Sequence, residues 1–465
     1  MTWDRTLDLA TFELLRRFPD KTAVPVLTPR QRAAGASIVA LGTIGLLAET
    51  TPTLVAMISF ALALGCSATA HRLVLCARGL PRSEEAAPAP WDDDDALPVY
   101  TVLVPLYREA AVVGGLLEAI RRLDYPPGKL DVKLLVEADD EETIAALAAL
   151  DPGPPYELVV VPDAQPKTKP KACNYGLAHA RGDYVVIFDA EDRPEPDQLR
   201  KAVAAFRSAP PHVRCFQAHL NYWNRTQNLL TRWFTCEYSQ RFDLFLPGLA
   251  STGAPIPLGG TSNHLPIPLV RELGGWDPFN VTEDADLGFR LARAGYRTCV
   301  LDSTTYEEAN SRLGSWVRQR SRWIKGLIQC WLVLTRRPLQ VAGELGATGW
   351  VHCQLLTAGS FVPLFVNPVL LALLVLWGTG VALLPSAVYL AIAAEALFSN
   401  AIFVALNVVA VERRGFGRVA AAALLYPVYR LLMSAGAWRG LVQLVTRPSY
   451  WEKTPHGLAE PEPAG

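Results

Sequence analysis

Carboxylates follow three short apolar runs of this 465-residue chain, at the points where those runs end. The segments are Pro105–Glu109, Glu137–Thr143 and Asp189–Asp192, with the sequences PLYRE, EADDEET and DAED. Carboxylates that lie close together raise one another's pKa and favour a bound cation. Oxygen ligands suit Mg²⁺ or Mn²⁺, which proteins often share with substrate phosphates. The alternative is that acids such as Glu141 and Glu142 only cap the helix that follows.

Two later segments could complete a site for transfer chemistry. The lysine-rich stretch 167–174, KTKPKACN, precedes a predicted helix and could contact phosphates. Asp284 lies in the first turn of another predicted helix, which Thr282 begins and Gly295 ends. A carboxylate at that position is either a partner of the helix dipole or a general base. Spacing alone leaves both interpretations open.

A basic helix is predicted over Ser311–Gly326, just before a long apolar region. Gln319, Arg322 and Trp323 fall at i, i+3 and i+4, so they share one helix face. The Arg322 guanidinium could bind an anion through two parallel hydrogen bonds, and the Trp323 indole offers a flat apolar surface. The alternative is an amphipathic helix that its tryptophan anchors in the membrane, and we favour that interpretation for Trp316.

The remaining cations of this helix have a separate expected role. Arg318, Arg320 and Lys325 are expected to contact anionic lipid headgroups.

The chain from Val99 alternates short β-rich runs with stretches of helical period. The runs VYTVLVP, VKLLVEA, YELVVVP and DYVVIFDA are almost continuously apolar, as strands buried on both faces are. This alternation predicts an α/β fold with a doubly wound, mostly parallel sheet. Ligands of such sheets bind beyond the carboxyl ends of the strands, which is where the three acidic segments lie.

Apolar segments on both sides of this region predict a membrane protein. Half of the residues (50%) are hydrophobic, and Ala33–Ala48 with Leu54–Ala70 forms a predicted helical hairpin. Basic residues flank its two open sides but not its turn, which places both flanks in the cytoplasm. No charged residue lies between Glu344 and Glu395, a length sufficient for two spans.

The last apolar run, Val419–Val445, contains Arg430 and Arg439 and is one tilted span, two short ones or partly interfacial. A carboxylate within a span, as expected for Glu395, is costly and often functional.

Composition restricts the partners of the chain. A formal net charge of −1 argues against nucleic acid as a general partner. The eight cysteines show no zinc-type spacing and are expected to be buried apolar residues. No cleavable signal peptide is expected at the charged N-terminus. The expected domains begin with a cytoplasmic amphipathic N-terminus (1–32), a transmembrane hairpin (33–78) and a linker (79–98). An α/β domain (99–330), an interfacial helix (331–347), C-terminal spans (348–446) and a tail (447–465) are expected to follow.

The ordered set of motifs resembles the membrane-embedded processive glycosyltransferases of family 2, the group of cellulose, chitin and hyaluronan synthases. The motifs are PLYRE, the acidic second strand end, KPKACN, DAED, GGTSN, TED and QRSRW. The resemblance covers roughly residues 99–330 as a GT-A domain, and the tail RPSYWEKTPHG resembles bacterial exopolysaccharide members. It therefore implies a GT-A domain in the cytoplasm and an α-helical transmembrane region.

The resemblance also implies roles for individual residues. The predicted nucleoside pocket is lined by Tyr107, Glu109, Glu137 and Asp139. The diphosphate and its Mg²⁺ or Mn²⁺ would contact Lys169, Asp189 and Glu191. The catalytic set would be Asp284 as the base with Glu283, Gln319, Arg322 and Trp323. The chain departs from the family pattern at Glu191, which is followed by Asp192, so either could bind the metal; it also has Glu137 where many relatives have aspartate.

The implied activity is inverting transfer from a nucleotide-sugar, expected to be a UDP-sugar, to a growing β-linked polysaccharide. The resemblance implies a processive enzyme that exports product through its own spans in a bacterial inner membrane, with envelope export proteins as possible partners. Two alternatives remain: transfer of a single sugar to a polyprenyl phosphate, and a non-catalytic membrane scaffold or receptor with the same fold.

Overall fold

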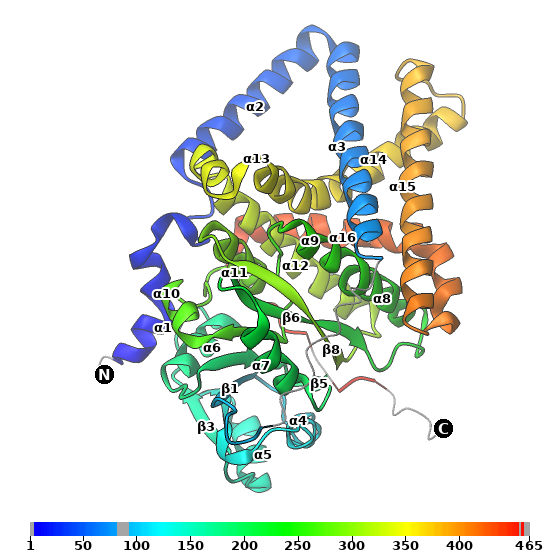
Figure 1. Ribbon diagram of the computed structural model, residues 1–465. Helices are drawn as coiled ribbons and strands as arrows, with labels where there is room; N and C mark the ends of the chain where they lie inside the picture. The colour runs from blue at the N-terminus through cyan, green and yellow to red at the C-terminus, as the bar shows by residue number, and fades with distance from the viewer. Residues whose placement is uncertain (1–3, 81–92, 455–456, 460–465) are drawn as a thin grey trace.

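The computed structural model describes residues 4–80, 93–454 and 457–459. Most of the expected linker, residues 81–92, lies outside the described residues, as do 1–3 of the N-terminus and 455–456 and 460–465 of the tail. The α/β domain lies at one end of the molecule, and the long apolar helices from both ends of the chain gather at the other (Figure 1).

Eight strands of the described chain form one sheet, in the order β3-β2-β1-β4-β7-β6-β8-β5. The first half is parallel, as the sequence predicted, with β1 between β2 and β4. The second half is mixed because the short β7 runs antiparallel to both β4 and β6. The strands are β1 Tyr100–Leu106, β2 Leu130–Glu137, β3 Tyr156–Val161, β4 Tyr184–Ile187, β5 Arg193–Pro194, β6 Val213–Tyr222, β7 Asn263–Pro266 and β8 Arg297–Glu307.

Helices cover the sheet because β1 and β2 are apolar on both faces. Every residue of β2 is buried, and in β1 only Pro105 is partly exposed. Burial on both faces requires helices on both sides, and the sequence supplies one after almost every strand. These helices are α4 Val113–Arg121, α5 Glu141–Leu150, α6 Lys169–Ala178, α7 Gln198–Ser208, α8 Leu229–Ser239, the π-helix η3 Gln240–Phe245, α9 Leu246–Thr252, α10 Ile267–Glu272 and α11 Glu283–Arg293.

The N-terminal helix α1, Arg5–Arg17, docks on this domain. Asp4 caps it by accepting hydrogen bonds from the backbone N–H groups of Thr6 and Leu7. It packs against α6, and the Arg17 guanidinium donates to the carbonyl oxygens of Arg271 and Glu272, both at 2.8 Å.

Five helical segments among the described residues are long and apolar enough to cross a membrane. They are Pro29–Ala48, Thr50–Arg78, Pro338–Gly378, Ser386–Arg413 and Gly417–Thr446. Within them lie α2 Pro29–Ala48, α3 Thr50–Arg78, α13 Pro338–Leu356, α14 Ala358–Gly378, α15 Ser386–Arg413, η4 Gly417–Leu425 and α16 Tyr426–Thr446. Helices α3 and α15 stand upright in Figure 1, whereas α16 lies across them beside α12, Leu313–Leu334. Helix α12 thus runs past residue 330, where the sequence placed a domain boundary.

Candidate active site

A cavity of about 780 Å³ lies beyond the carboxyl ends of β1, β2 and β4 and continues between the apolar helices. Strand ends, loops and helix α12 all contribute to its wall. Eleven of the twelve predicted site residues line it: Tyr107, Glu109, Glu137, Lys169, Asp189, Glu191, Glu283, Asp284, Gln319, Arg322 and Trp323. The twelfth, Asp139, lies beside the cavity, where its carboxylate accepts a hydrogen bond from the Tyr107 hydroxyl at 3.3 Å and pairs with Lys167 at 2.7 Å.

Lys169 and two carboxylates meet beside Gly260. The Lys169 ammonium forms an ion pair with Asp189 and donates to the Gly260 carbonyl at 2.8 Å. A Cβ atom built on Gly260 would lie 3.7 Å from Asp284 Oδ2 and 4.0 Å from Asp189 Oδ2. Burial opposes the charge of Lys169, but Asp189 and Glu283 outweigh it and raise the pKa of Lys169. The lysine is therefore a fixed positive charge between the strand end and α11.

Two acids of the DAED segment, Glu191 and Asp192, differ in their surroundings. Glu191 lines the cavity, whereas Asp192 is fully buried and does not. The Oδ2 atom of Asp192 accepts hydrogen bonds from the Asp189 backbone N–H at 2.8 Å and from the Thr261 hydroxyl. Burial, with the charges of Asp189 and Glu191, raises the pKa of Asp192 far above its usual value. Asp192 thus shapes the turn, and Glu191 faces the ligand space.

A further acid, Glu307 at the end of β8, lines the same cavity. Burial raises its pKa well above the usual value, and the charges of Asp192, Glu191 and Asp189 raise it further. Among the described residues, no three His, Cys, Asp or Glu side chains come together as a complete metal site. This concentration of carboxylates fits a divalent cation that completes its ligands with substrate phosphates, as Mg²⁺ and Mn²⁺ commonly do.

Glu283 and Asp284 occupy the first turn of α11. Burial raises the pKa of Glu283 to about 8, with the charge of Asp284 adding to the effect. Burial also raises the pKa of Asp284, against the opposing charges of Lys169, Arg241 and Arg322. Because these three cations oppose the effect of burial, Asp284 can hold a negative charge in the cavity wall.

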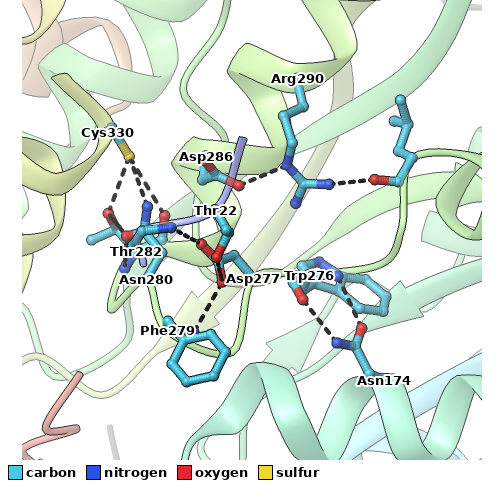
Figure 2. A network of polar contacts seen from close by, with 12 residues as sticks. Thr22, Asn174, Trp276, Asp277, Phe279, Asn280, Thr282, Asp286, Arg290 and Cys330 are labelled. Carbon is cyan, nitrogen blue, oxygen red and sulfur yellow. Dashed lines mark hydrogen bonds and ion pairs between the residues drawn. The ribbon is translucent and has the colours of Figure 1, made fainter. Parts of the chain in front are cut away.

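The loop before α11 is held from three sides (Figure 2). Asp277 accepts hydrogen bonds from the Thr22 hydroxyl at 3.0 Å and from the Ala23 backbone N–H at 2.6 Å, so the N-terminal segment fixes it. Asn174 of α6 accepts from the Trp276 N–H at 2.9 Å. From α12, the Cys330 sulfur lies 3.5 Å from the Asn280 amide nitrogen. This network fixes the position of the two acids that follow.

Gln319, Arg322 and Trp323 all reach the cavity from α12, as the helical spacing predicted. Trp323 packs against Tyr238 with ring centroids 6.3 Å apart. Helix α12 approaches the TED segment closely, because a Cβ on Gly326 would lie only 2.4 Å from the Thr282 hydroxyl oxygen. The glycine therefore lets α12 hold Arg322 near α11.

Two expectations for the basic helix are wrong. Trp316 is fully buried, and its indole N–H donates to the Tyr429 hydroxyl at 3.3 Å, so it does not anchor the helix in lipid. Arg320 is buried and paired with Glu237, and the buried Lys325 donates to the Tyr450 carbonyl at 2.8 Å, so neither contacts headgroups. The helix lies within the protein because α16 packs along it, Phe234 and Glu237 of α8 contact it, and the tail covers it.

The sequence interpretation gave no role to the tail or to Arg241. Lys453 of the tail pairs with Glu109 at 3.0 Å and donates to the Arg108 carbonyl at 2.7 Å. Trp451 lines the cavity beside Arg322. Arg241 lines it from the π-helix η3. The sequence marks the tail only as a family likeness, although a tryptophan two residues before a lysine is a signal for a ligand-facing segment.

The cavity wall combines strand-end acids, a facing lysine, a carboxylate at a helix start and an arginine. These groups could bind a cation and a diphosphate and take up a proton. Residues 98–326 match the family model described as glycosyltransferase like family 2. Residues 98–326 therefore form a domain of glycosyltransferase family 2, as the motifs predicted.

Curated relatives share this domain. The chain is 29% identical over 243 residues to a probable glucomannan 4-beta-mannosyltransferase 3 of Oryza sativa, covering 50% of this chain and 43% of the relative. It is 28% identical over 289 residues to the beta-monoglucosyldiacylglycerol synthase of Synechocystis sp., covering 60% of each. The chain spans about half the length of the curated relatives it matches.

A solved structure supports the GT-A fold. The mannosyltransferase PcManGT from Pyrobaculum calidifontis, in complex with GDP-Man and Mn²⁺, superposes with a TM-score of 0.54 at 23% identity. The match covers 83% of this chain and 98% of PcManGT. The predicted combination of a GT-A domain with long apolar helices is thereby confirmed.

Proposed function

We propose that the chain transfers a sugar, with inversion, from a nucleotide-sugar to an acceptor hydroxyl at the inner face of a membrane. The observation that carries this proposal is that Asp284 and Asp189, from α11 and the end of β4, both face the space beside Gly260. A sugar at that point would have its diphosphate beside Lys169 and its reacting carbon within reach of Asp284.

In this mechanism Tyr107, Glu109 and Glu137 bind the nucleoside, with Asp139 holding Tyr107 in place. Asp189 and Glu191 would hold Mg²⁺ or Mn²⁺, which would supply positive charge to the leaving diphosphate. Metal binding at Glu191 rather than Asp192 is supported by the cavity, which Glu191 lines and Asp192 does not, and by the two hydrogen bonds that Oδ2 of Asp192 accepts.

Asp284 takes the proton from the acceptor hydroxyl as that oxygen attacks the sugar carbon. Arg322 and Lys169 stabilise the charge that builds on the diphosphate as its bond to the sugar breaks. Trp323 faces the acceptor sugar, and Gln319 lies beside it on the same helix face. Glu283, whose pKa is about 8, supplies no second negative charge at neutral pH. Because the acceptor oxygen displaces the diphosphate in a single step, the configuration at the reacting sugar carbon is inverted.

The acceptor reaches the site from the membrane side. The cavity continues from the strand ends to apolar residues of the long helices, among them Gly359, Phe361 and Pro363. This continuity supports a growing β-linked polysaccharide that leaves through the spans of the enzyme. We place the enzyme in a bacterial inner membrane, with a cytoplasmic catalytic domain, and assign it to exopolysaccharide synthesis with envelope export proteins as partners.

The test is a donor screen on the purified full chain in detergent with Mn²⁺ or Mg²⁺. UDP-sugars are the expected donors, and GDP-mannose belongs in the panel because PcManGT binds it. Release of nucleotide from one donor, lost in Asp284→Asn, supports the proposal. A ladder on a gel indicates a polysaccharide, whereas one sugar per lipid indicates the single-transfer alternative. Absence of release with every donor would favour the scaffold alternative and refute the proposal.

A further inference from the structure

Three arginines line the membrane side of the cavity: Arg72 of α3, Arg241 of η3 and Arg430 of α16. None of the three forms an ion pair with a carboxylate of the described chain, in contrast to Arg320 with Glu237 and Arg414 with Asp243. Three cations that converge on one space without a carboxylate partner need an anion from elsewhere.

Aromatic rings and neutral groups hold these guanidiniums. The Phe403 ring centroid lies 5.4 Å from Arg72 Cζ and 4.2 Å from Arg430 Cζ, so one ring contacts both cations. Arg72 donates to the Gln240 side-chain oxygen at 3.0 Å, and Arg430 lies 3.4 Å from the Asn400 side-chain oxygen. These contacts orient the guanidiniums without neutralising them.

Arg241 connects this pair to the catalytic acids. Its guanidinium donates to the Pro257 carbonyl at 3.3 Å, which keeps it in the cavity wall. Burial lowers the pKa of Arg241, the charge of Arg72 lowers it further, and the charge of Asp284 opposes both. The guanidiniums thus run from the proposed base toward the apolar helices.

Other titratable groups around the arginines do not cancel their charge. Glu395 of α15 also lines the cavity, and it accepts a hydrogen bond from the Ser399 hydroxyl at 2.5 Å. His71 lies 2.7 Å from His352, ring nitrogen to ring nitrogen. Glu237 also lines the cavity but is paired with Arg320. Asp284 faces Lys169 and Arg322 as well as Arg241. The three guanidiniums therefore outnumber the carboxylates that remain to balance them.

The arginines lie near the level expected for lipid headgroups. Arg72 stands six residues before the end of α3, which is about 9 Å along the helix. This end of α3 is fixed to the catalytic domain, because a Cβ on Gly79 would lie 1.9 Å from the Leu244 carbonyl oxygen. Apolar side chains, including Phe361 and Leu364, line the cavity on its membrane side. A phosphate at the arginines would leave its hydrocarbon chain among those residues.

We propose that Arg72, Arg241 and Arg430 bind the phosphate of a membrane lipid that carries the acceptor of this enzyme. The inference rests on the proposed transfer to an acceptor in this cavity. It assigns a lipid-linked acceptor in place of polymer export through the spans, since the hydrocarbon chain would occupy the apolar wall at Phe361. Arg241 interacts with both Arg72 and Asp284, so an acceptor sugar attached to the phosphate would extend toward the base. Lipid phosphate is favoured over a carboxylated polymer because apolar residues adjoin the site.

The test measures binding separately from transfer. Full-length protein in phosphate-free detergent micelles is titrated with a polyprenyl monophosphate or with the polyprenol of the same length. We expect the monophosphate to bind at least about tenfold more tightly than the polyprenol. The double variant Arg72→Gln/Arg430→Gln should lose this difference. The control Arg225→Gln, which removes an arginine 4.5 Å from the Phe416 ring outside the cavity, should keep it.

Further outcomes separate the sources of the anion. Inorganic phosphate that binds as tightly as the lipid phosphate, or a hexuronate oligosaccharide that binds more tightly, would overturn the assignment to a lipid. Equal binding of monophosphate and polyprenol by the wild type would also overturn it. Donor-dependent nucleotide release remains the test of the proposed function, so either proposal can fail while the other stands.

Discussion

The Arg322 guanidinium carbon lies 4.4 Å from the centroid of the Trp451 ring, which joins the catalytic helix to the tail of the chain. The tail is held there by α12 itself. Lys325 donates to the Tyr450 carbonyl at 2.8 Å, and Gln329 donates to the Pro448 carbonyl at 3.3 Å. The indole thus packs against the guanidinium that we propose binds the diphosphate.

Removal of this ring should weaken transfer. A cation–π contact of this kind contributes about 0.5–2 kcal/mol, so Trp451→Ala should lower kcat/KM for the donor by about 2- to 30-fold. Trp451→Phe, which keeps an aromatic ring beside Arg322, should retain most of the activity. Steady-state kinetics on purified protein would measure both, and full activity in Trp451→Ala would show that the stack has no catalytic consequence.

Asp284→Asn should abolish measurable transfer while the protein remains folded. Loss of a general base typically costs about 100- to 10,000-fold in rate, and the amide cannot accept the acceptor proton. Asp302→Asn, a change on the exposed side of β8, is the control and should retain the wild-type rate. Nucleotide release from the preferred donor is the readout. Turnover in Asp284→Asn equal to that of the control would exclude the assigned role.

Glu191 and Asp192 should respond differently to loss of their charge. Glu191→Gln should raise the Mn²⁺ concentration needed for half-maximal activity by about tenfold or more, because it removes a proposed metal ligand. Asp192→Asn should leave this concentration nearly unchanged, since an amide oxygen can still accept from the Asp189 backbone N–H and the Thr261 hydroxyl. Titration of activity with Mn²⁺ compares them, and the reverse pattern would move the metal to Asp192.

Sequence patterns located the strand-end side of the site because it depends on short-range order. A buried apolar run followed by PLYRE or DAED places its acids at the end of a strand, and this placement does not depend on contacts with distant segments. The helical spacing of Gln319, Arg322 and Trp323 likewise fixes a shared face. These features required no knowledge of distant contacts.

Contacts between distant segments explain what sequence patterns missed. The sequence predicted that Arg320 faces lipid, whereas in the structure it forms an ion pair with Glu237 of α8. Trp451 and Arg241 enter the site from the tail and from a π-helix, where neither strand nor helix periodicity marks a ligand-facing side. The mixed half of the sheet was also missed, because β7 is only four residues long and carries no recognisable strand pattern.

The protonation of Glu283 gives a prediction about stability and pH. Its pKa is about 8 in the folded protein, against 4.5 for an ordinary glutamic acid, because burial and Asp284 disfavour the charge. The folded state therefore keeps a proton that the unfolded state releases, so the free energy of unfolding falls as pH rises from 4.5 to 8. The slope from this group is about 1.4 kcal/mol per pH unit.

Glu283→Gln removes this titration, so the variant should gain stability over the wild type as pH rises through that window. Thermal unfolding of detergent-purified protein at pH near 5.5 and 7.5 would measure the effect as the difference in Tm between variant and wild type. That difference should be clearly larger at the higher pH. Glu272→Gln, an exposed change in the preceding helix α10, should show the same difference at both pH values. A Tm difference for Glu283→Gln that does not change with pH would mean that Glu283 is already ionised in the folded protein, and that Lys169 and Arg322 then face two negative charges rather than one.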